Sequence, residues 1–530
     1  MGQNSFAAGN SLKASGDSSV AFGKWVTAAG TGAFVAGSEA VYANGDFSFA
    51  LGNKSNQSTG NYSLAIGNNS NIATGDYSIA IGNNANNANA NYSIAIGNSS
   101  NLANAEFSIA IGYGVNIANG VYSISMGRNS NTADGDYSIA MGQNVNQAAG
   151  NYSISLGNAY NKAEHDFSIA IGHNDNRATG LFSFAIGSDN NLAGADHTFA
   201  LGKNENYALG HHSFAIGNSM NKATGIHSLA FGSNENLADG EYSFAKGKNA
   251  NKATGNYSAA IGSDGNIAAG NHSYVIGKSN QADQDFSTAL GFFNHAEKTG
   301  AIAIGYTNTA SGDNSFALGY RNQATGTYSV AIGYSNISAG LNSISMGTGC
   351  RAPSFGEISM GLYPTEYTAT NASAFTTVDR IFTVGNGESE YTRSNALVIL
   401  KNGNSELFGS VSQLSDETVK KNIQPLTDVL MKLRQIKGVS FEWISDMMSD
   451  GRQIGVIAQE LQKEFPELVK ENTNGYLVVN YPSLTAVLLQ AIHEQQDVIN
   501  SQRMTLESMQ EMNTEINKLF KKNGLMPMEL

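Results

Sequence analysis

The feature that most constrains this chain is a glycine that returns every 15 residues, from Gly52 to Gly277, without a miss. Sixteen glycines lie on this series, three precede it and five follow it at a spacing of 14 residues, from Gly9 to Gly347 in all. We call them the comb glycines. A fixed period of this length indicates stacked units that bury their apolar sides against one another.

One unit, residues 67–81, reads GNNSNIATGDYSIAI. The alternation over Ser78–Ile81 predicts a short strand, Asn71–Ala73 predicts a second, and Gly75 predicts a turn. Two strands and two turns leave no room for a helix, so the repeat predicts a mostly β chain folded as a parallel β-solenoid. The extra residue of the longer unit falls between the comb glycine and the asparagine that follows it in most units. This position is in a turn, so both strands keep their inward and outward faces.

An asparagine also recurs once per unit, from Asn56 to Asn336. Two interpretations are open at this point. Stacked asparagine amides can hydrogen-bond from turn to turn, as in cross-β ladders. Alternatively, asparagine is present because it tolerates a left-handed turn conformation. Neither interpretation implies catalysis.

A column of aromatic residues runs from Tyr62 to Phe182 and continues as His197, His212 and His227. Three imidazoles one turn apart suggest a metal site. The column is aromatic above and below them, however, and no cysteine or carboxylate column accompanies it. We therefore predict ring stacking, with no metal and no cofactor.

The pattern of Ser315–Gly319, repeated in about two dozen turns, resembles the head repeat of YadA-type trimeric adhesins. This resemblance covers residues 1–350. It implies a left-handed parallel β-roll whose three chains pack side by side. The 24 comb glycines give 23 intervals, so the roll should be about 110 Å long at the usual strand spacing. The common unit of that family has 14 residues, so the central 15-residue units are a departure.

Composition agrees with a repetitive solenoid and excludes several classes of function. The chain has 59 glycines, 6 prolines and 14% charged residues, which is unlike an enzyme core. A net charge of −13 without a Lys/Arg cluster argues against nucleic-acid binding. The single cysteine, Cys350, rules out an intrachain disulfide. No apolar run is long enough to span a membrane, so no membrane insertion is expected.

The repeat breaks at Arg351–Pro353, which predicts a boundary near residue 350. Residues 351–410 contain two apolar runs, Arg380–Gly387 and Ala396–Gly403, each closed by an Asn-Gly turn signal. We predict a small β connector here. Residues 411–530 are poor in glycine and alternate short helical and strand patterns, which predicts an α+β domain.

A last helix is predicted from Leu484 to about Phe520, with a heptad pattern. Glutamine and asparagine in an apolar seam lower stability but fix register and oligomeric state. Three strands of coiled coil would match a trimeric head. The a positions are Ile492, Ile499, Leu506, Asn513 and Phe520, and the d positions are Leu488, Gln495, Gln502, Met509 and Ile516.

Three further motifs lie in order in this region: Ser415–Ile423, Gly455–Val469 and Val479–Tyr481. They resemble the intramolecular chaperone auto-processing domain of phage tail fibres, tailspikes and endosialidases. The resemblance implies a domain that drives trimer assembly and then cuts itself off with a Ser-Lys dyad.

Carried onto this sequence, the dyad is Ser415 and Lys420, with Asp416 in support and cleavage between Leu414 and Ser415. Thr418 stands where that family often has arginine. A serine hydroxyl needs a base, and lysine serves as one only when burial or nearby cations lower its pKa. Lys421 and the packing of three chains could do this. The alternative is that Ser415 and Asp416 cap a helix with Lys420 on its exposed side.

Two classes of function remain. The first is a phage or phage-like attachment fibre on a virion tail or extracellular particle. It would be a homotrimer in which each chain cleaves itself once. Its N-terminus would join a tail or baseplate component, and it would bind an unknown cell-surface receptor, either glycan or protein. The second is a bacterial surface adhesin of the trimeric autotransporter type. That class should begin with a secretion signal and end in a membrane anchor, whereas Leu525–Leu530 resembles no anchor, so we favour the fibre.

Overall fold

The computed structural model describes residues 1–444 and 451–524, and it divides into two compact units, Met1–Leu397 and Val398–Leu530. Each unit is considered by itself. The last six residues of the predicted C-terminal domain, 525–530, lie outside the described residues.

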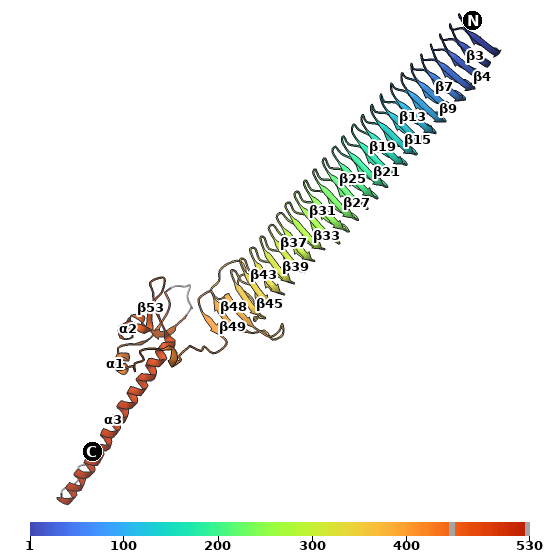
Figure 1. Ribbon diagram of the computed structural model, residues 1–530. Helices are drawn as coiled ribbons and strands as arrows, with labels where there is room; N and C mark the ends of the chain where they lie inside the picture. The colour runs from blue at the N-terminus through green and yellow to red at the C-terminus, as the bar shows by residue number, and fades with distance from the viewer. Residues whose placement is uncertain (445–450, 525–530) are drawn as a thin grey trace. The chain divides into compact units, whose positions relative to one another are not determined.

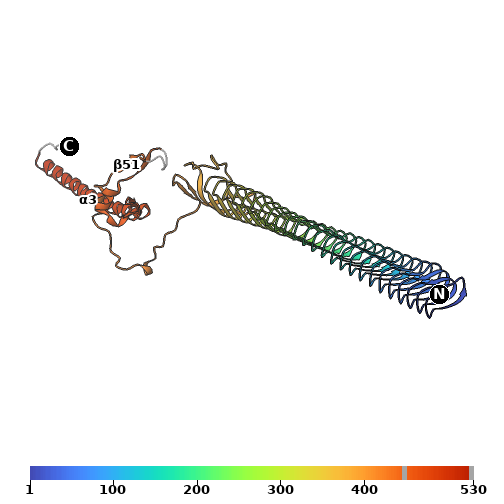
Figure 2. The ribbon, with the colours of Figure 1, turned by 90° about the horizontal axis from the view of Figure 1, so that it is seen from above.

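The first unit is the predicted parallel β-solenoid, which confirms the fold class (Figure 1). A typical turn has a five-residue strand, such as β9 (Ile79–Asn83), and a two-residue strand, such as β10 (Asn87–Ala88). The long strand of one turn pairs in parallel with that of the next, so that Ile79 of β9 faces Ile94 of β11 (Ile94–Asn98). Figure 2 shows the same stacking in the turned view, from β1 (Phe6–Asn10) onward.

The comb glycines lie where successive turns approach too closely for a side chain to fit. Gly67 has φ +133°, and a Cβ on it would lie 1.8 Å from the carbonyl oxygen of Gly82 in the next turn. No side chain fits in that distance, and the backbone conformation is one that other residues rarely adopt. The 15-residue period therefore reflects a steric requirement that is repeated in every turn.

The extra residue of the longer turns lies in the turn, as predicted. A 15-residue unit has two left-handed residues after its long strand, for example Asn69 (φ 67°) and Ser70 (φ 58°). A 14-residue unit has only one there, for example Thr307 (φ 54°). The period first changes between β3 (Val20–Ala28) and β4 (Phe34–Ala43), where the register shifts by one residue.

The recurrent asparagines form the hydrogen-bonded ladder and do not occupy the left-handed turn positions. Asn71 Nδ2 donates to Asn56 Oδ1 at 2.9 Å and to the Gly82 carbonyl oxygen at 3.0 Å, and the pattern continues to Asn336. These side chains are buried. The backbone N–H of Cys350 then donates to Asn336 Oδ1 at 2.8 Å, and burial raises the pKa of the Cys350 thiol to about 11. Cys350 is therefore the terminal member of the ladder.

The interior of the solenoid is made almost entirely of small side chains. Two alanine columns, represented by Ala80 and Ala88, and a serine column, represented by Ser78, are fully buried. Alanine buries little apolar surface, so each turn gains little from its own core. Backbone hydrogen bonds and neighbouring turns must supply most of the stability.

The outward side chains of the long strands form two apolar rows. Positions one and three of each strand, such as Ile79 and Ile81 of β9, are only partly buried. We call these the outer rows. Lys246 is the one charged residue in the second row. Two long, mostly apolar rows beside an alanine core leave substantial apolar surface for contact with another chain.

The aromatic column stacks as predicted. Ring centroids from Phe47 to Phe286 are 4.6–5.3 Å apart, and the rings of the histidine segment are nearly parallel. His197, His212 and His227 are exposed at their edges and continue the stack between Phe182 and Tyr242. Ring stacking thus accounts for these imidazoles.

A further column of polar side chains holds the turn that precedes the aromatic residues. Asp76 Oδ1 accepts the backbone N–H of Asn61 at 2.8 Å, and Asn91 Oδ1 accepts that of Asp76 at 2.9 Å. We call this the Asp/Asn column. From Gln3 to Leu341 no two acidic residues are neighbours in it.

The parallel ladder does not stop at the predicted boundary near residue 350. β45 (Ile344–Thr348) pairs with β47 (Ile358–Leu362), which pairs with β48 (Arg380–Asn386). The glycine spacing lengthens from 14 to 24 residues between Gly361 and Gly385, because residues 363–379 are inserted between these strands. The prediction of a connector at 351 follows the change in sequence pattern, whereas the backbone continues to stack.

Glu357 occupies the serine column at this end of the solenoid, in the place that Ser343 fills one turn earlier. Its side chain is fully buried. Glu357 Oε2 accepts hydrogen bonds from the Ser354 backbone N–H at 3.1 Å and the Tyr367 hydroxyl at 2.9 Å, while Oε1 has no partner among the described residues. Burial raises the pKa of Glu357 to about 7.

The second unit is a small α+β assembly. Its core packs α1 (Val429–Leu433), α2 (Ala458–Glu464) and β53 (Val469–Glu471) against the start of α3 (Tyr481–Lys522). β49 (Asn395–Leu400), which pairs with β50 (Ser405–Leu407), begins in the first unit and ends in the second. The second unit also contains β51 (Gly438–Phe441) paired with β52 (Gln453–Val456), β54 (Leu477–Val479) beside β53, and the short helices η1 (Glu417–Val419) and η2 (Pro466–Leu468).

The buried Glu357 predicts a pH-dependent stability. Its folded pKa of about 7 lies above its ordinary value of 4.5, so the folded state binds the extra proton between these values and loses stability as pH rises through them. Glu357→Gln keeps the two accepted hydrogen bonds and removes the charge. The melting temperature of the variant, relative to wild type, should increase from pH 4.5 to 7 and then level off. A constant difference, or the same trend in an exposed Glu388→Gln control, would contradict this.

The histidine stack predicts the opposite dependence. Desolvation of the stacked ring and the charges of His197 and His227 hold the pKa of His212 below its ordinary 6.5. Its stabilising contribution is therefore present above pH 6.5 and lost as pH falls. Hydrogen exchange of residues 190–235, corrected for the intrinsic rate, should be faster at pH 5 than at pH 7.5. His212→Tyr, a residue that other turns carry in this column, should reduce the difference in exchange between pH 5 and pH 7.5. Equal protection of wild-type protein at the two pH values would refute the prediction.

Candidate active site

The serine and lysine predicted from the sequence lie in contact. Lys420 Nζ donates a hydrogen bond to Ser415 Oγ at 2.7 Å. Both residues belong to the segment that precedes α1, and the short helix η1 lies between them. This distance is within the range required of a nucleophile and its base.

Local hydrogen bonds fix the spacing of the pair. Asp416 Oδ1 caps η1 by accepting the Thr418 backbone N–H at 2.8 Å and the Thr418 hydroxyl at 2.7 Å. These two bonds lower the pKa of Asp416. The Lys420 backbone N–H donates to the Glu417 carbonyl oxygen at 3.0 Å and ends the turn. The cap and the serine–lysine contact, considered as alternatives in the sequence, are therefore present together.

Thr418 has an identifiable place in this turn. Its hydroxyl and its backbone N–H both bind the same oxygen of Asp416. An arginine at this position would have no hydroxyl to donate, so the second of these hydrogen bonds depends on threonine.

The pair is open to solvent in the single chain. Ser415, Asp416 and Lys420 are exposed, and Leu414 is 80% exposed. The Leu414–Ser415 peptide bond is therefore accessible. The burial that a neutral lysine requires is not supplied by the residues around η1.

Glu494 is a residue that the sequence analysis missed. Its carboxylate on α3 accepts the backbone N–H groups of Val429 (3.0 Å) and Leu430 (2.7 Å) at the start of α1. These bonds lower the pKa of Glu494. Asp428 stands at the usual capping position but has φ 58° and makes no cap bond. No local sequence signal points to a cap from 65 residues away.

Comparison with known protein families gives two matches. The family described as chaperone of endosialidase, Peptidase_S74, matches residues 415–470. The YadA head domain repeat matches residues 2–24, 43–70, 58–85, 73–100, 88–114, 118–144, 208–234, 268–294, 296–322 and 324–349. No curated protein matched the chain. The chain carries YadA head repeats followed by a chaperone of endosialidase domain.

These matches indicate the class of molecule. YadA head repeats and a chaperone of endosialidase domain support a trimeric fibre or adhesin with an extracellular or surface-exposed location. The Peptidase_S74 match implies a self-cleaving peptidase domain, and both families suggest a homotrimer. Among the described helices, none has a stretch long and apolar enough to cross a membrane.

Proposed function

We propose that the chain is a trimeric attachment fibre whose chaperone domain aligns three chains and then releases itself by cutting between Leu414 and Ser415. The observation that carries this proposal is the 2.7 Å hydrogen bond from Lys420 to Ser415. The Peptidase_S74 match begins at that serine, which supports its place at the cleavage point.

The proposed reaction needs no cofactor. Lys420 in its neutral form takes the proton of the Ser415 hydroxyl, and Ser415 Oγ attacks the Leu414 carbonyl carbon. The tetrahedral intermediate breaks its C–N bond, the Ser415 nitrogen gains a proton, and an ester joins Leu414 to Ser415 Oγ. Water then hydrolyses the ester. The scissile bond is in the chain itself, so each chain reacts once and no other substrate is expected.

Assembly supplies the trigger in this proposal. A lysine acts as a base when burial or nearby cations bring its pKa toward neutrality. Ser415 and Lys420 are exposed in the single chain, so we infer that packing of three chains buries them. Lys421 adds a neighbouring positive charge from each chain.

Two surfaces support the homotrimer. The outer rows leave half-buried isoleucine, leucine and methionine side chains along the solenoid. Along α3, the seam residues Ile492, Leu506 and Met509 are 62%, 56% and 62% exposed. Exposed heptad residues on a 42-residue helix favour a coiled coil, which would align the chains before the solenoids pair.

Two settings fit such a fibre. We favour a phage or phage-like tail fibre with a tail or baseplate component as its partner, because self-releasing chaperone domains serve assembly of a fibre. A bacterial surface adhesin of the trimeric autotransporter type is the second candidate, favoured by the YadA head repeats. In either setting, three copies of a weak receptor site would act together.

The self-cleavage prediction is tested on a denaturing gel. Wild-type protein should give two pieces, residues 1–414 and 415–530, once assembly is complete. Ser415→Ala and Lys420→Ala should each give one full-length band and still form trimers, because neither side chain lies in the apolar seam or core.

Matched variants separate chemistry from folding. Lys421→Ala removes a neighbouring lysine but not the proposed base, so it should still cleave, although more slowly. Thr418→Val removes the hydroxyl donor to Asp416 and should slow cleavage by loosening the turn. A wild-type trimer that stays intact, or an alanine variant that still splits before Ser415, would overturn the dyad.

The trimer prediction is tested by light scattering. The alanine core of each turn buries too little surface to stabilise a long isolated solenoid. The released fragment of residues 1–414 should therefore form a particle with three times the mass of a single 1–414 fragment. Replacing Ile171 in an outer row by aspartate should lower the melting temperature of that trimer. Gln143→Asp, which introduces the same charge at an exposed strand position outside the outer rows, is the matched control. A stable folded monomer of the fragment would contradict the proposal.

A further inference from the structure

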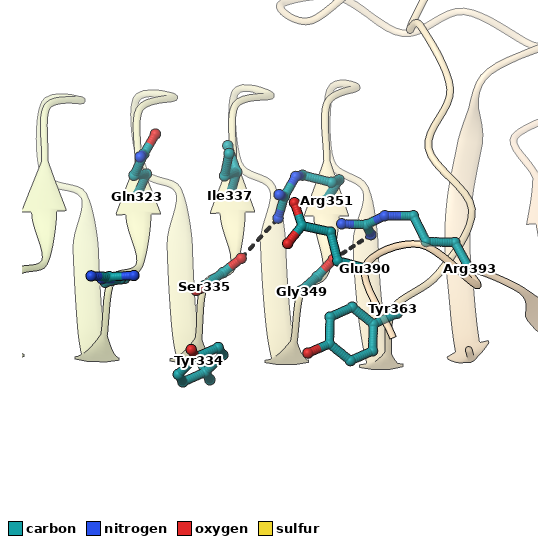
Figure 3. Close-up of a pocket in the computed structure, with 10 residues that line it drawn as sticks. Gln323, Tyr334, Ser335, Ile337, Gly349, Arg351, Tyr363, Glu390 and Arg393 are labelled. Atoms are coloured by element: carbon teal, nitrogen blue, oxygen red, sulfur yellow. Dashed lines mark hydrogen bonds between the residues drawn. The ribbon is translucent and has the colours of Figure 1, made fainter. Parts of the chain in front are cut away.

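A polar hollow lies on the turn surface near the end of the solenoid (Figure 3). The left-handed turn position of four successive turns is occupied by Arg321, Ser335, Gly349 and Tyr363. Along this series the side chains become smaller from Arg321 to Gly349, which has none, and the next one, Tyr363, is large. A Cβ on Gly349 would lie 2.5 Å from the Tyr363 ring. This change in size opens a cavity of about 340 Å³.

One wall of the hollow is the end of an aromatic stack. Tyr306, Tyr320 and Tyr334 stack with centroids 5.1 and 5.2 Å apart and rings within 5° of parallel. The next residue in register after Tyr334 is Thr348, and among the described residues no ring stacks on the second face of Tyr334. In the long column from Phe47 to Phe286 each inner ring has a neighbour on both faces. Tyr334, which is 46% exposed, therefore offers an aromatic face to a ligand.

Two arginines of the hollow are used by the fold. Arg351 donates to the Ser335 carbonyl oxygen at 2.8 Å, and Arg393 donates to that of Gly349 at 2.7 Å. Both also pair with Glu366, at 3.5 and 3.1 Å. These bonds fix the edge of the hollow at Ser335 and Gly349, and Arg393 holds residues 387–394 beside that edge.

Arg321 and Glu390 are the exposed charged residues that line the same cavity. The Arg321 guanidinium lies 5.3 Å from the centroid of the Tyr320 ring, one turn before Tyr334. Figure 3 shows the Glu390 carboxylate in front of the Arg351 guanidinium. The hollow thus combines an open aromatic face, an exposed guanidinium and an exposed carboxylate.

We propose that this hollow binds a saccharide that carries a carboxylate. A pyranose ring has an apolar face that fits the open face of Tyr334, and small-ligand sites typically combine aromatic walls with a few polar groups. A guanidinium pairs with a carboxylate through two parallel hydrogen bonds, which assigns the acid group to Arg321. Glu390 accepts hydrogen bonds from sugar hydroxyls.

This inference rests on the attachment role proposed above and names the chemical class of the receptor. A trimer would carry three copies of the hollow. An acidic polysaccharide repeats its sugar unit many times, so several hollows could be occupied by one or neighbouring chains, which increases the avidity.

The test measures binding of full-length protein to immobilised polysaccharides of known composition. The acidic probes are alginate, polygalacturonate, hyaluronan and C6-oxidised cellulose, and the neutral probes are dextran and unoxidised soluble cello-oligosaccharides. We expect binding to at least one acidic probe and none to its neutral counterpart. Tyr334→Ala and Arg321→Gln should each weaken that binding by about tenfold or more.

Tyr328→Ala removes another exposed tyrosine, one that does not line the cavity, and it should bind like wild type. Every variant is first checked for trimer mass and for the two-band pattern. If a variant is trimeric and cleaved but does not bind, the defect lies in the hollow alone. If a variant fails to assemble, the result bears on the proposed fibre function and not on the hollow. Binding to none of the acidic probes, preference for the neutral ones, or unchanged binding by Tyr334→Ala and Arg321→Gln would overturn the proposal.

Discussion

The structure depends on the close approach of successive backbones at the comb glycines. With the Gly82 carbonyl oxygen 1.8 Å from where a Gly67 Cβ would lie, the turns can stack only if this position has no side chain. The close stacking allows each asparagine amide to reach the previous amide and the glycine carbonyl of the next turn. It also places aromatic rings at about 5 Å, the distance at which they stack. The ladders are consequences of the glycine constraint.

Much of the first unit could be predicted because the same pattern is repeated about two dozen times. The glycine period predicted the stacked turns of the solenoid, and the alternation of apolar and small residues predicted the inward and outward faces of the strands. Comparison of 14- and 15-residue units predicted that the extra residue lies in a turn. The continuation through Gly385 could not be predicted, because an inserted segment breaks the period while the strands still pair. Glu357 could not be recognised either, since only the register places it in the serine column.

The candidate site shows a different limit. A serine and a lysine five residues apart fit many backbones, so the pairing of Ser415 with Lys420 came from a resemblance over three motifs. The 2.7 Å contact depends on the η1 turn, which is held by Asp416 and Thr418. The hollow beside Tyr334 was not predicted. It arises from side-chain size along one turn column and from where an aromatic stack ends, and both are visible only once the register is known.

The Asp/Asn column bears on how such a chain changes its length. Asp46, Asn61, Asp76 and Asn91 alternate, so this part of the column repeats every two turns although the backbone repeats every turn. Duplication of one aspartate-bearing turn would place two carboxylates about 4.8 Å apart, where like charges repel. Duplication of a two-turn block would keep the alternation. Gene duplications that lengthen this rod are therefore tolerated best when they add turns in pairs.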